Sequence, residues 1–190
     1  MRPAVFLDRD DTLIDTRAVT ASTPHPGDLT DPALVRLLSN AAAGCRALAE
    51  AGFALVVISN QGAVARGRAT LRDVEAVNDR LRALLAAEGV RLDATYYCPF
   101  HPGGSAPAFR VEHPWRKPAP GMYLAAAAEL ELDLARSWAV GDAARDVLSA
   151  VTAGIASARA IIVGKGPGIW YPDLAAAAEV ICQASRSPAT

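Results

Sequence analysis

The residues best suited to chemistry are carboxylates that follow an apolar run near the start of the chain. The sequence from Ala4 reads AVFLDRDDTL, so Asp8 and Asp10 come directly after the run with one arginine between them. Side chains two positions apart in an extended chain point to the same side, so we expect the two carboxylates to face one spot. Such a pair suits a divalent cation that prefers oxygen ligands, typically Mg²⁺. Thr12 adds a hydroxyl at the next turn.

A lone Asp-x-Asp pattern has a plainer interpretation. A strand that ends in a solvated acidic turn has the same residues, and this is the commoner origin of the pattern. The interpretation as a site therefore depends on other polar groups being brought to the same place.

Polar side chains also follow two later apolar runs. Ser59 and Asn60 come after the run at 53–58, and Asp142 comes after Trp138–Val140, with Asp146 four residues on. Carboxyl ends of parallel strands meet at one edge of a sheet, so we expect these groups to lie near Asp8. Hydroxyl and amide groups bind phosphate oxygens, although Ser-Asn also forms ordinary turns and an aspartate also caps helices.

The segment 98–119 is rich in Pro and Gly and too long for a plain connection. We expect it to fold over the site as a lid, with Arg116 and Lys117 near its end. An arginine fork suits bidentate recognition of phosphate, and a lysine supplies a compact charge. An Arg-Lys pair is also common on solvated surfaces.

Apolar runs and helical patterns alternate along the chain, which predicts an α/β doubly wound parallel sheet. The expected strands are 4–7, 53–58, 94–97, 138–140 and 160–163, with a sixth at 180–182. The first expected helix is capped by Asp31 and runs from Pro32 to Gly52, and the second is capped by Thr70 and Asp73 and reaches Glu88. A third is expected from Gly121 to about Leu130, and a fourth begins near Ala143. The residues 14–30 are expected to form a long loop, and Gly164, Lys165, Gly166 and Gly168 a glycine-rich turn.

Composition favours one compact domain over residues 1–190. The net charge is −1 and 52% of residues are hydrophobic, so we expect no nucleic-acid partner and no membrane partner. The three cysteines show no C-x-x-C spacing and argue against a disulfide framework. We expect a cytoplasmic monomer that acts on a small molecule.

Taken together, four separated motifs resemble the haloacid dehalogenase-like (HAD) phosphohydrolases. They are Asp8-Arg9-Asp10-Asp11-Thr12, Ser59-Asn60-Gln61, Arg116-Lys117-Pro118, and Gly141-Asp142 with Asp146. Within that superfamily the chain resembles the D-glycero-D-manno-heptose 1,7-bisphosphate 7-phosphatases and their histidinol-phosphatase relatives. The segments that show it are FLDRDDT, ALVVISNQGAVARG, YYCPFHP, FRVEHPWRKPAPGM and AVGDAARD. The resemblance implies a Rossmann-like fold without a large cap domain.

The resemblance also implies roles for individual residues. Asp8 is expected to attack phosphorus and form an aspartyl-phosphate, and Asp10 to act as general acid and then base. Mg²⁺ would be held by Asp8, the backbone carbonyl of Asp10 and Asp142. Ser59 and Lys117 would bind the phosphoryl oxygens. Asn60 and Arg116 would line the sugar side of the site, and Thr12 would orient the loop that carries the nucleophile.

The chain departs from the family pattern at two positions. One departure concerns substrate binding, and the other concerns the turn after the first strand. Ala143 stands where the family often has a lysine, which removes one possible substrate cation. Asp11 stands where the closest members usually carry glycine. We expect Asp11 to adopt the turn conformation that glycine favours, at some cost, without a catalytic role.

The family's zinc site in the lid, of pattern C-x-H with C-x-C, is also incomplete here. Phe100 and Trp115 occupy two ligand positions, and His101 lies one residue from the usual place. A three-ligand zinc site of Cys98, His101 and His113 stays open, but we expect no structural zinc. We expect aromatic packing to hold the lid instead, by Phe100, Phe109 and Trp115.

The expected activity is therefore magnesium-dependent hydrolysis of a sugar phosphate monoester, with heptose 1,7-bisphosphate as the first candidate substrate. Histidinol phosphate is the alternative, because the same machinery would serve it. A non-catalytic phospho-ligand binder is the rival from another class, and it has no need for the second acid, Asp10. A nucleic-acid end phosphatase would need a basic track that the balanced charge does not suggest.

Overall fold

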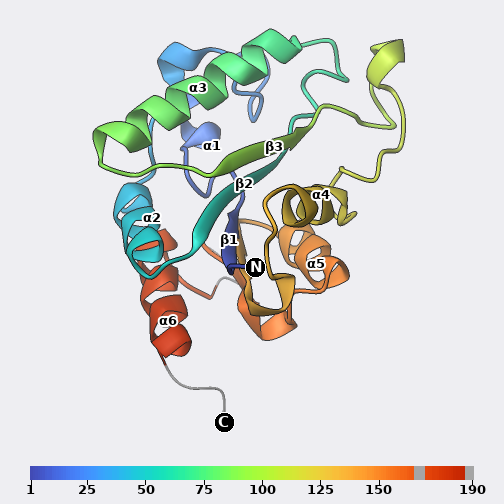
Figure 1. Ribbon diagram of the computed structural model, residues 1–190. Coiled ribbons are helices and arrows are strands. Elements are labelled where there is room, and N and C mark those ends of the chain that lie inside the picture. The colour runs from blue at the N-terminus through green and yellow to red at the C-terminus, as the bar shows by residue number, and fades with distance from the viewer. Residues whose placement is uncertain (165–169, 187–190) are drawn as a thin grey trace.

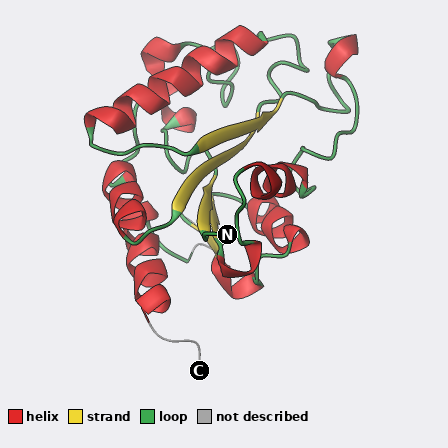
Figure 2. Cartoon of the chain, in the orientation of Figure 1, coloured by secondary structure: helices red, strands yellow, loops and turns green. Residues whose placement is uncertain are grey.

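Five parallel strands form the central sheet in the computed structural model, which describes residues 1–164 and 170–186. In Figure 2 strands of this sheet lie between helices. The strands are β1 (Ala4–Leu7), β2 (Ala54–Asn60), β3 (Ala94–Cys98), β4 (Trp138–Gly141) and β5 (Ala160–Ile162). Their order is β3-β2-β1-β4-β5, and each neighbouring pair is parallel. The predicted doubly wound α/β fold is confirmed.

Helices cover both faces of this sheet (Figure 1). On one face, α2 (Ala41–Glu50), α3 (Leu71–Ala87) and α6 (Leu174–Arg186) pack against the side of β1 that carries Val5 and Leu7. On the other, α4 (Gly121–Glu129) and α5 (Ala144–Ala153) pack against the side that carries Ala4 and Phe6. All four β1 residues are buried, which explains the continuous apolar run in the sequence.

The strand order reverses at β1. The chain builds β2 and β3 on one side of β1 and then crosses to β4 and β5 on the other. Leu7 pairs with Val57 of β2 and with Val140 of β4, so the residues that follow these positions meet at one edge. Open α/β sheets place ligand sites at such a switch point, beyond the carboxyl ends of the strands.

The helix predicted from Pro32 to Gly52 is wrong in its first half. Asp31 does cap a helical turn, but this is a short 3-10 helix, η1 (Pro32–Leu34), and α2 begins only at Ala41. Between them, the backbone N–H of Leu38 donates to the carbonyl of Leu13 at 2.9 Å. This pairing with the segment after β1 requires extended backbone and overrides the helical pattern.

The sixth strand predicted at 180–182 is also wrong, because these residues lie in α6. Leu174, Ala177, Ala178 and Ile181 are buried at helical spacing, and this period extends through the apolar triplet. None of the described helices is long and apolar enough to span a bilayer.

Shorter elements complete the connections. The predicted loop 14–30 contains one helical turn, α1 (Thr16–Val19), and the other 3-10 helices are η2 (Pro107–Phe109), η3 (Leu134–Arg136) and η4 (Ser157–Arg159). Thr70 and Asp73 cap α3 reciprocally, as predicted. Of the predicted glycine-rich turn, Gly164 has a φ of 127°, and the residues 165–169 lie outside the described parts.

Candidate active site

An acidic cavity of about 300 Å³ lies at the switch point. Its walls come from the turn after β1, the first loop, the end of β2 and the start of α5. The lining residues are Asp8, Asp10, Asp11, Thr16, Arg17, Gly27, Asn60, Asp142, Ala143 and Arg145. The sequence pattern predicted the contributions of β1, β2 and β4, but it did not single out Thr16, Arg17 or Arg145.

Lys117 joins two carboxylates at the base of this cavity. Its Nζ lies 2.5 Å from Oδ1 of Asp8 and 2.6 Å from Oδ1 of Asp146, and it donates to the carbonyl of Ile58 at 2.8 Å. All three charged side chains are buried. Burial raises the pKa of Asp8 to about 7, with Asp146 and Asp10 adding to the rise and Lys117 opposing it.

The carboxylates of Asp8, Asp142 and Asp146 can present oxygen atoms within 4.8 Å of one another. Oδ2 of Asp8 is buried and has no hydrogen-bond partner in the described residues. An unpaired buried oxygen beside two further carboxylates fits a hard divalent cation such as Mg²⁺. Asp146, whose partner the sequence left open, lies in one group with the expected ligands Asp8 and Asp142. Ligation by these residues and by the backbone carbonyl of Asp10 stays a prediction.

Gly141 allows this cluster to form. A Cβ atom at this position would lie 2.5 Å from Cβ and Cγ of Asp146. Asp146 also accepts a hydrogen bond from the backbone N–H of Ala143 at 3.1 Å, which fixes its carboxylate at the start of α5. The Gly-Asp motif thus gives Asp146 room to reach Lys117.

Four donors surround the carboxylate of Asp10. They are Nη2 of Arg9 at 3.2 Å, Oγ1 of Thr16 at 2.5 Å, Nε2 of Gln61 at 2.8 Å and Oγ of Ser59 at 3.3 Å. Burial raises the pKa of Asp10, but Arg9 and the hydrogen bonds outweigh it and hold that pKa below its usual value. These donors therefore favour the carboxylate form of Asp10, which can take a proton.

Some of the remaining predicted residues line the acidic cavity and others do not. Asn60 lines the acidic cavity and exchanges two hydrogen bonds of 3.0 Å with the backbone of Lys117. Ser59 is buried beside Asp10, whereas the Thr12 side chain is buried and is not part of the cavity lining. Asp11 has a φ of 57°, the left-handed conformation expected for it, and accepts a hydrogen bond from the backbone N–H of Arg17.

A second, smaller cavity of about 180 Å³ adjoins the first. It is lined by Arg66, Arg116 and Arg145 together with Asn60 and Gly62, so Arg145 and Asn60 belong to both cavities. Burial lowers the pKa of Arg116, and the nearby charge of Arg66 contributes. Isolated arginines in a loop and a helix gave no signal in the sequence, so Arg66 and Arg145 were missed.

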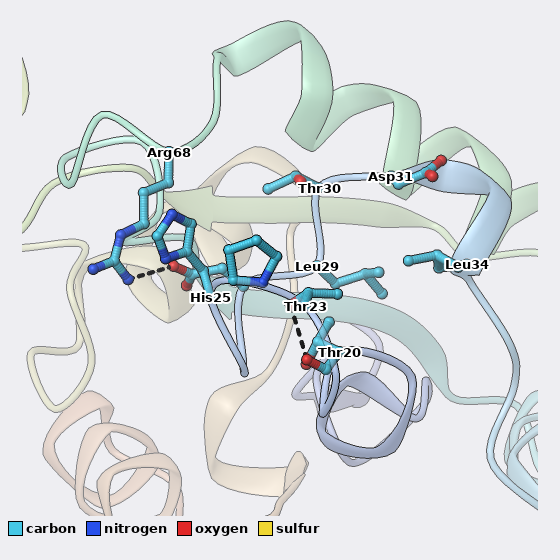
Figure 3. Close-up of a pocket in the computed structure, with 10 residues that line it drawn as sticks. Thr20, Thr23, His25, Leu29, Thr30, Asp31, Leu34 and Arg68 are labelled. Atoms are coloured by element: carbon cyan, nitrogen blue, oxygen red, sulfur yellow. Dashed lines mark hydrogen bonds and ion pairs between the residues drawn. The ribbon is translucent and has the colours of Figure 1, made fainter.

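The loop after α1 is fastened next to this cationic cavity. Asp28 is paired with Arg66 at 2.5 Å and with Arg68 at 3.1 Å. Figure 3 shows Arg68 and His25 together at one end of a third cavity, of about 270 Å³, which is lined mostly by residues of the same loop. Gly27 lines the acidic cavity, so Asp28 ties a wall of the site to the segment after β2.

The segment 98–119 contains aromatic packing where a zinc site was considered. The ring of Phe100 stacks on that of His113, with the ring centroids 4.3 Å apart, and packs against Phe109, with the centroids 5.7 Å apart. Trp115 meets Tyr96 edge-on at a centroid distance of 6.0 Å. In the described residues, Cys98, His101 and His113 do not form a group with metal-ligand spacing. The packing expected of Phe100 and Phe109 is confirmed, and Trp115 meets the ring of His113 edge-on with the ring centroids 6.1 Å apart.

Comparison with known proteins places this geometry among phosphatases. A family model for HAD-like hydrolases matches residues 114–167. D-glycero-β-D-manno-heptose-1,7-bisphosphate 7-phosphatase of Yersinia pestis is 37% identical over 86% of this chain and 82% of its own length. The Escherichia coli K12 protein of the same name is 37% identical over 86% and 81%.

Solved structures agree. A HAD-like phosphatase from Mesorhizobium loti has a TM-score of 0.81 at 31% identity, over 99% of this chain and 90% of that one. A heptose 1,7-bisphosphate phosphatase from B. bronchiseptica, solved with magnesium and phosphate, has a TM-score of 0.76 at 28% identity, over 97% and 99%.

Proposed function

Because this chain belongs to the HAD-like phosphatases, in the family of the heptose-1,7-bisphosphate 7-phosphatases, we propose that it removes the 7-phosphate of D-glycero-D-manno-heptose 1,7-bisphosphate. The reaction passes through an aspartyl-phosphate. The observation that supports this most strongly is Lys117 bridging Asp8 and Asp146 at the end of β1, where Asp8 keeps a buried oxygen without a partner in the described residues.

In the first half of the reaction the Asp8 carboxylate attacks phosphorus. A bond forms between Asp8 and phosphorus as the bond to the sugar oxygen breaks. Asp10 enters this step protonated and gives the leaving oxygen the proton that it regains from water in the second half. Lys117 and Ser59 bind the phosphoryl oxygens and favour the crowded transition state. Thr12 orients the turn that carries both aspartates.

In the second half Asp10 takes a proton from water, and the water oxygen attacks phosphorus. The bond between phosphorus and Asp8 then breaks, which releases inorganic phosphate and restores the enzyme. The donors around Asp10 suit this step, because they stabilise a carboxylate close to the attacking water.

Mg²⁺ is the cofactor that these residues fit. Asp8, Asp142 and Asp146 with the backbone carbonyl of Asp10 would hold it, and the ion would supply neutralisation of the charge on a phosphate oxygen. No structural zinc is required, because aromatic packing holds the segment 98–119, whose Arg116 lines the cationic cavity.

The cationic cavity supports a bisphosphate substrate. It adjoins the acidic cavity through Asn60 and Arg145, so one small sugar can reach both cavities. The 7-phosphate occupies the acidic end, and the second phosphate lies against Arg116, Arg66 and Arg145. Histidinol phosphate would bring its ammonium group toward these arginines, which disfavours it.

A phosphate-release assay with Mg²⁺ tests this function. We expect the highest kcat/KM with heptose 1,7-bisphosphate, a lower value with heptose 7-phosphate, and the lowest with histidinol phosphate. A preference for histidinol phosphate, or the same rate with and without the second phosphate, would overturn the substrate assignment.

We further propose that the protein is a single-domain, cytoplasmic monomer with no nucleic-acid or membrane partner. All three cysteines are free, which suits a reducing compartment. The two cavities are formed by one chain, so catalysis needs no second copy. Light scattering at assay concentrations would check the monomer, and a dimer that dissociates with loss of activity would contradict it.

A further inference from the structure

A buried guanidinium lies directly behind Asp10. Arg9 is 1% exposed, and its Nη2 lies 3.2 Å from each carboxylate oxygen of Asp10. Its Nη1 donates to Oδ1 of Asn78 at 2.9 Å. A charge removed from water needs partners to offset the cost of burial. In the described parts of the chain, Asp10 and Asn78 are the side chains that accept from Arg9.

Asn78 reaches Arg9 from the middle of α3. It is 1% exposed and lies on the apolar side of the helix, near Val77 and Leu81. A buried amide in this position is costly unless it is hydrogen-bonded. Within residues 1–164 and 170–186, the bond to Arg9 is the one hydrogen bond that the Asn78 side chain makes. This bond links the guanidinium of Arg9 to α3.

Arg9 differs from the other donors to Asp10. Thr16, Ser59 and Gln61 come from the first loop and the end of β2, next to the acidic cavity, whereas Arg9 approaches from the interior under α3. The Asp10 side chain keeps 22% exposure. The guanidinium of Arg9 contacts both oxygens of this carboxylate from the interior, which restricts rotation of the Asp10 side chain about the bond to its carboxylate.

We propose that Asn78 is a positioning residue for this reaction: it anchors Arg9, and Arg9 orients the carboxylate of Asp10. The inference rests on the proposed function, in which Asp10 moves the proton. A misplacement of about 1 Å at a reacting group can cost on the order of a hundredfold in rate. Asn78 would thus influence turnover from the middle of a helix without touching substrate.

Three variants separate positioning from stability. Asn78→Leu removes the acceptor and keeps most of the volume, and Asn78→Asp keeps an acceptor. Val77→Ala loosens the same helix and leaves both hydrogen-bonding partners of Arg9, Asn78 and Asp10, in place. With heptose 1,7-bisphosphate and Mg²⁺, we expect Asn78→Leu to lower kcat about tenfold or more, with KM unchanged. Asn78→Asp and Val77→Ala should keep kcat close to that of the wild type.

A double-mutant cycle with Asp10→Asn gives the decisive readout. Under single-turnover conditions with excess enzyme, Asn78→Leu should cause no further loss in the Asp10→Asn background, because both changes act through one carboxylate. An equal loss in both backgrounds, or wild-type kcat for folded Asn78→Leu, would overturn the inference. Should Asn78→Leu fail to fold, Asn78→Ala replaces it in the same cycle, and the same results support or overturn the inference.

The two proposals can fail separately. If Asp10→Asn alone retains wild-type turnover, the role of Asp10 in the proposed function is wrong. If Asp10→Asn is impaired and Asn78→Leu is not, the proposed function stands and the positioning role falls.

Discussion

The Nζ atom of Lys117 lies 2.5 Å from Oδ1 of Asp8, and the two side chains are 1% and 4% exposed. This ammonium also pairs with Asp146, so one cation compensates two carboxylates that are out of reach of bulk water. The pair brings together residues 109 positions apart, from the end of β1 and from the segment before α4.

Lys117→Met should abolish most turnover and destabilise the protein. Removing one partner of a buried ion pair typically costs about 3 kcal/mol or more, because the other charge is left unpaired. Mg²⁺ should then raise the Tm of Lys117→Met more than that of the wild type, since the ion would be the remaining cation between Asp8 and Asp146. Thermal unfolding with and without Mg²⁺ measures this, and equal Mg²⁺ effects on both proteins would contradict the arrangement.

Asp8→Asn and Asp10→Asn should lose activity by different routes. Asp8→Asn lacks the nucleophile and should form no covalent intermediate. Mass spectrometry of acid-quenched protein checks this, because it can detect the intermediate in the wild type. Asp10→Asn should retain traces of turnover, since a general acid/base typically contributes about a hundred- to ten-thousandfold. Wild-type hydrolysis by Asp8→Asn in the presence of Mg²⁺ would refute the assignment.

Arg116→Ala and Arg145→Ala should change substrate preference. Each removes a cation from the wall of the second cavity, so the ratio of kcat/KM for heptose 1,7-bisphosphate over heptose 7-phosphate should fall about tenfold. Arg72→Ala is the matched control, because Arg72 is exposed on α3 and lines neither cavity. A preference ratio that stays unchanged in both variants would exclude the second cavity from substrate recognition.

Full activity should require Mg²⁺ and no zinc. His113, at one of the predicted ligand positions, stacks on Phe100, and its Nδ1 accepts a hydrogen bond from the backbone N–H of Trp115 at 3.1 Å. Metal analysis of untagged protein purified without chelator checks this, with Cys98→Ala as the paired variant. Stoichiometric zinc that disappears in Cys98→Ala would show the opposite.

Local pattern in the sequence determined much of the fold and the main chemical groups. The apolar run before Asp8 is a strand buried on both faces, and the polar ends of β1, β2 and β4 meet because parallel strands place their carboxyl ends on one edge. Thr70 and Asp73 cap α3 because capping depends on residues only three positions apart. These features follow from short-range spacing, which a sequence displays directly.

Contacts between distant segments decided the rest. The helical pattern from Pro32 gave way at Leu38, whose backbone pairs with Leu13, and no local signal reports such a partner. The sequence likewise contained Arg145, Arg66 and Asn78 without indicating that two of them line a cavity beside Arg116 and the third holds Arg9. Such roles depend on the directions in which side chains from separate loops and helices converge, and only the tertiary packing sets those directions.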